Sequence, residues 1–509
     1  MKNFYFLALL LLLSFITQAQ IVNIPDANFK NALVNTPCVD TDDNGTGDID
    51  ADTNNDGEIQ VSEAEAIISL EVNSRDISSL EGIQSFANLK WLFCRQNQLA
   101  SVDVSQNLNL EIFSISQNLL SSLNVSQNSN LLELNCSTNQ LTNLDVSQNT
   151  NLINLNCDVN QLISLDVSQN TDLISLGCSY NEINTIDLSQ NMNLENLIIS
   201  NNELVNLDLT PNINLETLGC NDNNLVSLNV TQSPNLHYII CDENELTTLD
   251  ITQNPNLTQV WCDHNEISNL DVSQNINLIV LRCSFNLIST LDVTQNSLLE
   301  RFICSQNQLT SLDVTQNPNL EWLYCSDNQI LNLDLTQNSY LEQFSCHNNQ
   351  LNELDLSENS NLSFLLCNDN LLTNLNIKNG NNTNMSAMYT FNNSNLFCIT
   401  VDDDDFSNSQ DCYNDYWCKD DWAHYSEDCS LGVEEISLLN IAIYPNPALD
   451  FINIDTEEKV ELIKIYSING QLIIAIPNNR INISELTSGL YFVKIAIENK
   501  TITKKFVKL

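Results

Sequence analysis

The chain has 509 residues and a formal net charge of −48, with 65 Asp and Glu against 17 Lys and Arg. Residues 439–509 hold eight of the basic and seven of the acidic residues, a net of +1, which leaves −49 on the rest. A surface this acidic repels phosphate backbones, so nucleic acid is excluded as a partner. The same charge suits a solvated exterior and cation binding.

The first 19 residues are predicted to be a signal peptide. One Lys precedes an apolar run from Phe4 to Ile16, and Thr17-Gln18-Ala19 follows as a cleavage site before Gln20. The run is too short to cross a bilayer, and no other stretch of the sequence is long and apolar enough to do so. The chain is therefore expected to be secreted or held at the outer-membrane cell surface, without a transmembrane segment.

Residues 20–69 are expected to form an N-terminal cap that contains a calcium loop. Residues 52–63 place side-chain oxygens at positions 1, 3, 5 and 12 of a twelve-residue loop, with Gly57 at position 6. Calcium takes six to eight oxygens around a tight turn, and glycine permits that turn. The pattern resembles the calcium loop of EF-hands and dockerins. The expected ligands are Asp52, Asn54, Asp56 and Glu63 through their side chains, Glu58 through its main chain and Gln60 through a water. The alternative is an acidic loop without an ion.

A weaker copy of this pattern lies just before the loop. It resembles the start of a thrombospondin-type calcium repeat and consists of Asp40, Asp42, Asn44, Gly45 and Asp48. Position 12 is Ala51, so the closing carboxylate is missing unless Asp50 or Asp52 replaces it. A second ion therefore stays open. Either ion would be structural, because it would order an acidic stretch that leads through a short helix at Ala64–Leu70 and covers the first coil.

Residues 70–378 follow a single period of 21. Fourteen asparagines from Asn97 to Asn370 recur at this spacing without exception, which indicates one structural unit stacked on copies of itself. Residues 152–172 show the unit, L-x-x-L-x-C-x-x-N-x-L followed by L-x-V-S-Q-N. Apolar and exposed residues alternate in two places, which predicts two short extended arms in each coil. Neighbouring coils would then form parallel ladders about 4.8 Å apart.

The unit resembles the leucine-rich repeat, in register from Leu89 to about Leu375. It is similar to the short bacterial class in which Cys replaces the third leucine. The resemblance implies a β-rich solenoid of about 14 coils. The invariant asparagine fits this fold without any role in binding, since its amide can both donate to and accept from the backbone of its own coil and the next.

The 17 cysteines fall into two groups. Twelve occupy one column of the repeat, and isoleucine fills its two gaps, so the slot is expected to be apolar and interior. Disulfides and metal binding are not expected there, because stacked side chains stand a strand spacing apart and offer no tetrahedral cage. Residues 379–430 are expected to form a C-terminal cap with two disulfides among Cys398, Cys412, Cys418 and Cys429. Cys398–Cys429 is the favoured pair, although spacing does not fix connectivity.

After a linker at 431–438, residues 439–509 change character and are expected to be a separate domain. Short alternating apolar runs precede turns such as Asn469-Gly470. The segment resembles the C-terminal sorting domain of type IX secretion in Bacteroidetes-like bacteria. The resemblance rests on Tyr444-Pro445-Asn446-Pro447, on Gly489–Val493 and on Lys504, Lys505 and Lys508. It implies a small β-sandwich that the type IX secretion machinery recognises at the outer membrane. The alternative is an ordinary terminal β-domain that binds something.

The residues that point outward on the first arm are mostly small or polar in the early coils and bulky from the eighth coil on. Tryptophan, tyrosine and arginine dominate interface energetics, so a partner-binding patch is predicted on residues 237–326. Its members are Tyr238, Ile240, Trp261, Arg282, Arg301, Ile303, Trp322 and Tyr324. The alternative is that these side chains simply pack flat against their neighbours. The recurring Asp and Ser or Thr of the second arm are interpreted as solubility and turn chemistry, with polysaccharide or ice binding as a minor alternative.

The sequence contains no nucleophile–base pair, phosphate loop or catalytic metal pattern. The prediction is therefore a non-enzymatic binding or adhesion protein that recognises protein or glycan on its leucine-rich-repeat face. Two alternatives stay open. The chain could be a repeat-scaffold accessory of an extracellular hydrolase system, or a purely structural surface component.

Overall fold

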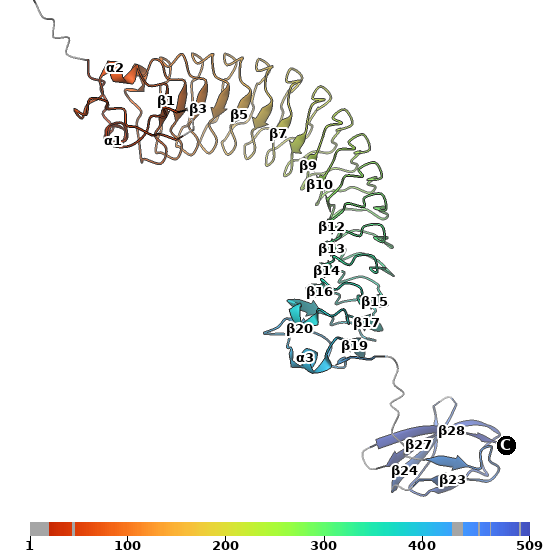
Figure 1. Cartoon of the computed structure of the whole chain (residues 1–509). Coiled ribbons are helices and arrows are strands. Elements are labelled where there is room, and N and C mark those ends of the chain that lie inside the picture. The colour runs from red at the N-terminus through yellow and green to blue at the C-terminus, as the bar shows by residue number, and fades with distance from the viewer. Residues whose placement is uncertain (1–19, 43–45, 430–440, 457–458, 469, 498–499) are drawn as a thin grey trace, which may run out of the picture. The chain divides into compact units, whose positions relative to one another are not determined.

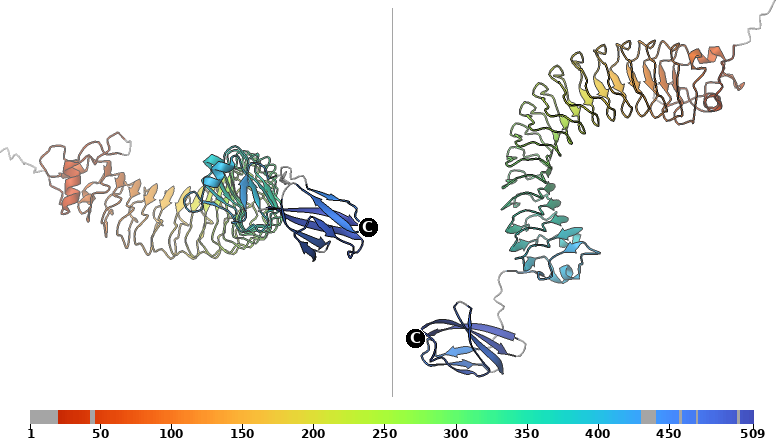
Figure 2. Two further views of the ribbon diagram at one scale, coloured as in Figure 1. Left: turned by 90° about the horizontal axis from the view of Figure 1, so that it is seen from below. Right: turned by 180° about the vertical axis from the view of Figure 1, so that it is seen from behind.

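The computed structural model describes residues 20–509 apart from 43–45, 430–440, 457–458, 469 and 498–499. The predicted signal peptide and linker therefore lie outside the described residues. The chain divides into two compact units, with the boundary between Glu427 and Asp428. In the first unit, coils of the chain stack into a bent solenoid (Figures 1 and 2).

The first arm of each coil is a short strand in one parallel sheet of 17 strands. Neighbouring strands are mostly 21 residues apart, so that Leu155 lies beside Leu176 and Leu197 lies beside Leu218. In order along the sheet, the strands are β1 (Ser69–Glu71), β2 (Trp91–Phe93), β3 (Ile112–Ser114), β4 (Glu133–Asn135), β5 (Asn154–Asn156), β6 (Ser175–Gly177), β7 (Asn196–Ile198), β8 (Thr217–Gly219), β9 (Tyr238–Ile240), β10 (Gln259–Trp261), β11 (Val280–Arg282), β12 (Arg301–Ile303), β13 (Trp322–Tyr324), β14 (Gln343–Ser345), β16 (Phe364–Leu366), β18 (Ala387–Tyr389) and β20 (Trp417–Cys418). The expected solenoid with a 21-residue period is confirmed.

The second arms form a ladder only near the C-terminal end of the solenoid. There β15 (Glu353–Asp355), β17 (Asn374–Asn376), β19 (Cys398–Thr400) and β21 (His424–Ser426) make a four-stranded parallel sheet. In the earlier coils, the second arms that the structure describes show only isolated bridges, such as Asn124 to Asp145. The expectation of two continuous ladders is therefore wrong. Strands β9–β14 and β16 lie on the inner side of the bend, while β15 and β17 lie on its outer side (Figure 1).

The interior of the solenoid is the predicted dry column of leucine and cysteine. The middle residue of each three-residue strand points inward, and the cysteine that follows twelve of the strands is buried, as Leu176 and Cys178 illustrate with 0% exposure. Burial raises the pKa of the Cys136 thiol to about 12. Thirteen cysteines are free thiols, the twelve of the column and Cys38. They behave as small apolar side chains, as the isoleucine substitutions predicted.

The invariant asparagine column pairs the backbone of adjacent coils. The side-chain amide of Asn118 donates to the carbonyl of Ile115 in its own coil, at 3.1 Å, and to that of Cys94 in the previous coil, at 3.0 Å. Its Oδ1 accepts the N–H of Leu99 at 3.0 Å. The chain reaches this asparagine through a residue with positive φ, such as Gln117 at 57°. Asparagine is required because aspartate could accept but not donate.

A second asparagine column, at the end of the V-S-Q-N segment, has a related role that the sequence analysis did not assign. Asn128 is fully buried, and its amide donates to the carbonyls of Val104 at 3.0 Å and Asn107 at 2.9 Å. Its Oδ1 has no protein partner among the described residues. Ser233 takes this position in one coil and donates to the Asn212 carbonyl instead. The two columns together tie each coil to the previous one at both turns.

Short helices and strands close the ends of the solenoid. The N-terminal end carries α1 (Ala27–Asn35) and α2 (Val61–Ala64), and η1 (Ile83–Ser85) follows. The helix expected at Ala64–Leu70 begins earlier because Gln60 and Glu63 form a capping box, and residues 69–71 are already strand. At the other end, η2 (Asn382–Asn384) precedes β18 and α3 (Asp404–Ser409) lies between β19 and β20 in the chain, so the segment expected as a cap continues both sheets.

The second unit is a small antiparallel β-domain, as the sequence predicted. One sheet contains β22 (Ala442–Tyr444), β23 (Phe451–Asp455) and β26 (Arg480–Asn482), and the other contains β24 (Val460–Ser467), β25 (Leu472–Ile476), β27 (Gly489–Ile497) and β28 (Lys500–Lys508). Its core is separate from that of the solenoid and includes Ile452, Ile465, Val493 and Phe506.

Candidate functional site

The eight residues of the predicted partner patch share one surface. Each is the first or last residue of a strand among β9–β13, so its side chain faces away from the core. The first residues form a row in register, with Arg301 beside Trp322, and the last residues form a second row in which Trp261 lies beside Arg282 and Ile303 beside Tyr324. We call the outward side chains of the long sheet the strand face. Its rigid backbone fixes the spacing of these groups.

Arg282 is held between an acid and an indole ring. Its guanidinium lies 4.6 Å from the ring centroid of Trp261, and its Nε and a terminal nitrogen lie 2.7 and 2.6 Å from Asp263 Oδ2. Asp263 is buried, and its other oxygen accepts the N–H of Ser284. Burial raises the pKa of Asp242, one coil earlier, to about 6, and the neighbouring Asp263 carboxylate adds to the shift. Arg282 is thus largely neutralised within the protein.

Arg301 is more exposed to solvent than Arg282. Its guanidinium stacks at 4.2 Å over the ring of Trp322, and its side chain is exposed. Trp322 is itself stacked against Tyr324 with centroids 6.4 Å apart, and the Tyr324 hydroxyl donates to the side chain of Gln343. No ion pair involves Arg301 among the described residues. This part of the face therefore offers a cation and flat aromatic rings in fixed positions.

The early coils, whose outward side chains are mostly small or polar, contain a hollow. Its volume is about 410 Å³, and it extends over the strand face from Phe93 to Ile198. The small side chains that made this region look unremarkable, Ser114, Asn135, Asn156 and Gly177, form its floor. A row of small residues between larger ones was the signal that could have revealed it.

The aspartates of the second arm make the expected local turns. Asp145 Oδ1, for example, accepts the N–H of Ser147 at 2.9 Å. Hydrogen bonds from this serine lower the pKa of Asp145. Asp166, Asp271 and Asp292 have the same arrangement with Ser or Thr two residues later. This geometry supports the interpretation as turn chemistry.

The side chains of the predicted calcium loop accept hydrogen bonds from the loop itself, and no three carboxylates of this loop, which the structure describes in full, have ligand oxygens within 4.8 Å of one another. Asp52 is 2% exposed, and its two oxygens accept the N–H groups of Asp56 and Gly57. Glu63 returns to the start of the loop, where it accepts from Thr53 and Asn54. Gly57 has φ of +83°, as the turn requires.

The side-chain amide of Gln60 donates to two of the predicted ligands, Asp56 and Glu58. The side-chain N–H₂ of Gln60 lies 3.0 and 3.2 Å from the Asp56 carboxylate oxygens and 3.5 Å from the Glu58 carbonyl. Glu58 uses its side chain for an ion pair with Lys30, at 2.6 Å, which leaves its carbonyl for the loop. This donor set of carboxylate, amide and carbonyl oxygens fits calcium.

Three of the four predicted ligands of the weaker site come together. Ligand oxygens of Asp40, Asp42 and Asp48 all lie within 4.8 Å of one another. Asn44 lies outside the described residues. Asp48 also accepts from the hydroxyl of Thr41 at 2.7 Å.

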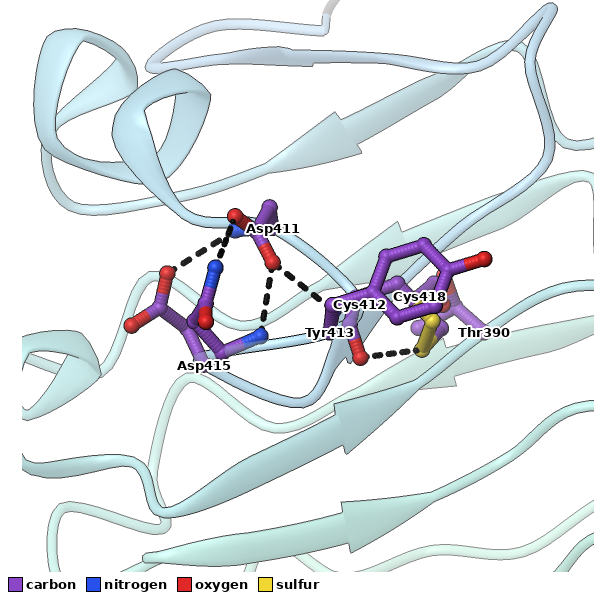
Figure 3. The surroundings of a disulfide bond; sticks show 7 residues. Thr390, Asp411, Cys412, Tyr413, Asp415 and Cys418 are labelled. Atoms are coloured by element: carbon purple, nitrogen blue, oxygen red, sulfur yellow. Dashed lines mark hydrogen bonds between the residues drawn. A yellow bond between two sulfur atoms is a disulfide. The ribbon is translucent and has the colours of Figure 1, made fainter.

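All four cysteines after the repeats are disulfide-bonded. Cys412 pairs with Cys418 and closes a short loop that carries Tyr413, which is 93% exposed (Figure 3). Asp411 organises this loop by accepting from the N–H groups of Tyr413 and Asn414, both at 2.7 Å (Figure 3). The pairing of Cys398 with Cys429 stays a prediction.

The motifs at the two ends of the C-terminal unit meet in space. Asn446 of the Tyr444–Pro447 segment accepts the N–H of Val507 at 2.9 Å and donates to the carbonyl of Lys505. Strand β28, which contains Lys504 and Lys505, pairs along its length with β27, which contains Gly489–Val493. The three segments that carried the resemblance thus form one structural element.

Comparisons with known proteins agree with these observations. Residues 442–509 match the family model described as a secretion system C-terminal sorting domain. The functional domain of the internalin InlJ from Listeria monocytogenes, whose structure is said to include a cysteine ladder, is 25% identical with a TM-score of 0.62, and the match covers 96% of this chain and 98% of that one. No curated protein matches the chain.

Two further solved structures share the repeat architecture. A leucine-rich-repeat protein from Leptospira interrogans is 26% identical with a TM-score of 0.53, over 61% of this chain and 92% of that one. The leucine-rich-repeat ectodomain of an Arabidopsis thaliana receptor kinase is 18% identical with a TM-score of 0.59, over 72% of this chain and 49% of that one. At 18% identity, the second likeness concerns the fold alone.

The protein is a leucine-rich-repeat solenoid with a cysteine ladder. Its C-terminal unit is a type IX secretion sorting domain, so the chain is an exported protein destined for secretion and attachment at the cell surface. No helix in the described part of the chain has the length and apolar character to cross a membrane. The resemblances to the leucine-rich repeat and to the type IX sorting domain are confirmed, while the resemblances to calcium loops stay predictions.

Proposed function

We propose that this exported protein is a non-catalytic binding protein whose strand face over β9–β13 contacts a protein or glycan partner. The observation that carries the proposal is the group formed by Arg301, Trp322 and Tyr324. These residue types dominate binding energetics, and here their geometry is fixed before binding. Preorganised side chains lose little conformational freedom on contact, which favours affinity.

The test uses the chain from residue 20 on a glycan array and on a panel of purified extracellular-matrix proteins. The double variant Trp261→Ala/Tyr324→Ala should lose at least tenfold in affinity for any ligand found. Tyr340→Ala serves as the matched control, because Tyr340 is an exposed aromatic of the same region outside the strands. Equal binding by the double variant and the wild type would contradict the proposed face.

We also propose that Asp52, Asn54, Asp56, Glu58 and Glu63 hold a structural calcium ion, and that Asp40, Asp42, Asn44 and Asp48 provide a weaker second site. The Asp56 carboxylate and the Glu58 carbonyl both accept from the Gln60 amide, which supports the first site, and the ligand oxygens of Asp40, Asp42 and Asp48 within 4.8 Å of one another support the second. The loop lies between α1 and α2 at the start of the solenoid, so an ion there would stabilise the covering of the first coil.

Chelation by EDTA should lower the melting temperature of the chain, and added calcium should restore it. A ligand present at 100 times its Kd stabilises by about 2.7 kcal/mol. Glu63→Gln should remove most of this response, while Glu65→Gln, at an exposed position just outside the loop, should keep it. A melting curve that EDTA leaves unchanged would remove calcium from the proposal.

A further inference from the structure

The hollow on the early coils combines an opening in the strand face with an uncompensated negative charge. Phe93, Ile112 and Ile198 give it apolar walls, and the smallest floor residue is Gly177. A Cβ atom at position 177 would lie 3.2 and 3.3 Å from the two carboxylate oxygens of Asp158. The glycine thus leaves open the space directly beside this carboxylate.

The charged residues that line the hollow are both acidic. They are Glu133, which is exposed, and Asp158, which is half-buried. One Asp158 oxygen accepts the N–H of Ser179 at 2.6 Å, and no ion pair in the described part of the chain involves either acid. The surrounding repeats from 91 to 377 hold 32 Asp and Glu against three Arg and no Lys. The field in the hollow is therefore negative, and a cation is the complementary group.

We propose that this hollow binds a lysine or arginine side chain presented by an extended segment of a protein partner, and the proposal rests on the binding function of the strand face. A long basic side chain places its aliphatic stem on apolar surface and its charge at the polar end, as the walls and the carboxylates require. From β2 to β7 the sheet spans five strand spacings, about 24 Å. An extended segment of about seven residues covers this length.

A library of random heptapeptides displayed on phage provides the probe, selected on the immobilised chain from residue 20. The selected peptides should contain Lys or Arg beside apolar residues. Glu133→Gln/Asp158→Asn should weaken them by at least tenfold, about 1.4 kcal/mol. The Asn side chain keeps an acceptor for the Ser179 N–H, so this variant is expected to fold. Replacing the basic residue of a selected peptide by norleucine should have the same effect.

A second variant fills the hollow without changing its charge. Ser114→Trp is compatible with the scaffold, because Trp261 and Tyr324 occupy the same position of other strands. It should abolish binding of the selected peptides, while Tyr340→Ala should not affect it. The melting temperatures of all variants show whether they remain folded.

The outcomes separate this inference from the proposed function. Some selected peptides could depend on Trp261 and Tyr324 but bind Ser114→Trp as well as wild type. Such peptides would overturn the proposed binding in the hollow and leave the strand face over β9–β13 as the binding surface. Selection of uncharged or acidic peptides, or unchanged affinity of the norleucine peptide, would also overturn it. A library that yields no binder at all would count against both proposals.

Discussion

Asn223, in the middle of the solenoid, offers a sharp test of the asparagine column. Its amide donates to the carbonyls of Ile199 at 3.0 Å and Cys220 at 3.1 Å, and its Oδ1 accepts the N–H of Leu204 at 3.0 Å. Asn223→Asp keeps the shape and the acceptor but removes both donors. Each buried group left without its partner costs about 1–3 kcal/mol, so the free energy of unfolding should fall by about 2–6 kcal/mol at pH 8.

The loss should depend on pH in a defined direction. Burial against carbonyl oxygens raises the pKa of the introduced carboxyl above its unfolded value of about 3.9. The penalty is therefore fully present above the raised pKa and shrinks as the pH falls towards 3.9, where the protonated carboxyl again donates one hydrogen bond.

The measurement is denaturant unfolding of the chain from residue 20 at pH 8 and pH 4.5, compared with wild type. Asn224→Asp is the control. Asn224 is exposed, so this substitution adds the same charge without contacting the asparagine column. The reasoning would be refuted if both variants lost the same stability, or if the loss in Asn223→Asp were equal at the two pH values.

Two further predictions follow from burial. Asp242→Asn should raise the melting temperature above pH 7 and have little effect below pH 4. The pKa of Asp242, raised to about 6, means that its carboxylate destabilises the fold at neutral pH and is harmless once protonated. An equal change in melting temperature at both ends of this pH range would contradict this cause. The thirteen free thiols should resist a thiol reagent in the native protein and all react in denaturant, since burial keeps them protonated. Rapid labelling of the native protein would show that the cysteine column is exposed to solvent.

The sequence predicted the repeat architecture well because one period controls both hydrogen bonding and packing. The cysteine slot, the role of Asn118 and the outward residues such as Trp261 all follow from the fixed position of each residue in the 21-residue unit. The motifs around Tyr444 and Lys504 identified the export domain for a different reason, because they are specific to it.

Features that depend on how coils lie relative to one another were not predictable in the same way. The bend of the solenoid is a property of the whole stack of coils, and no position of the 21-residue unit predicts it (Figure 1). The hollow above Gly177 arises from the contrast between several coils, while each of its residues is unremarkable alone. The open carboxylate of Asp158 becomes visible only when the neighbouring coil is in place.

The most direct test of the central claim is photo-crosslinking on cells that display the chain. A benzophenone amino acid at position 303 lies on the strand face, and the same residue at position 340 lies outside the strands. The probe in place of Ile303 should yield a discrete crosslinked partner, and the probe in place of Tyr340 should not. A partner captured from position 340 alone would show that binding occurs away from the strand face and would contradict the proposed binding surface.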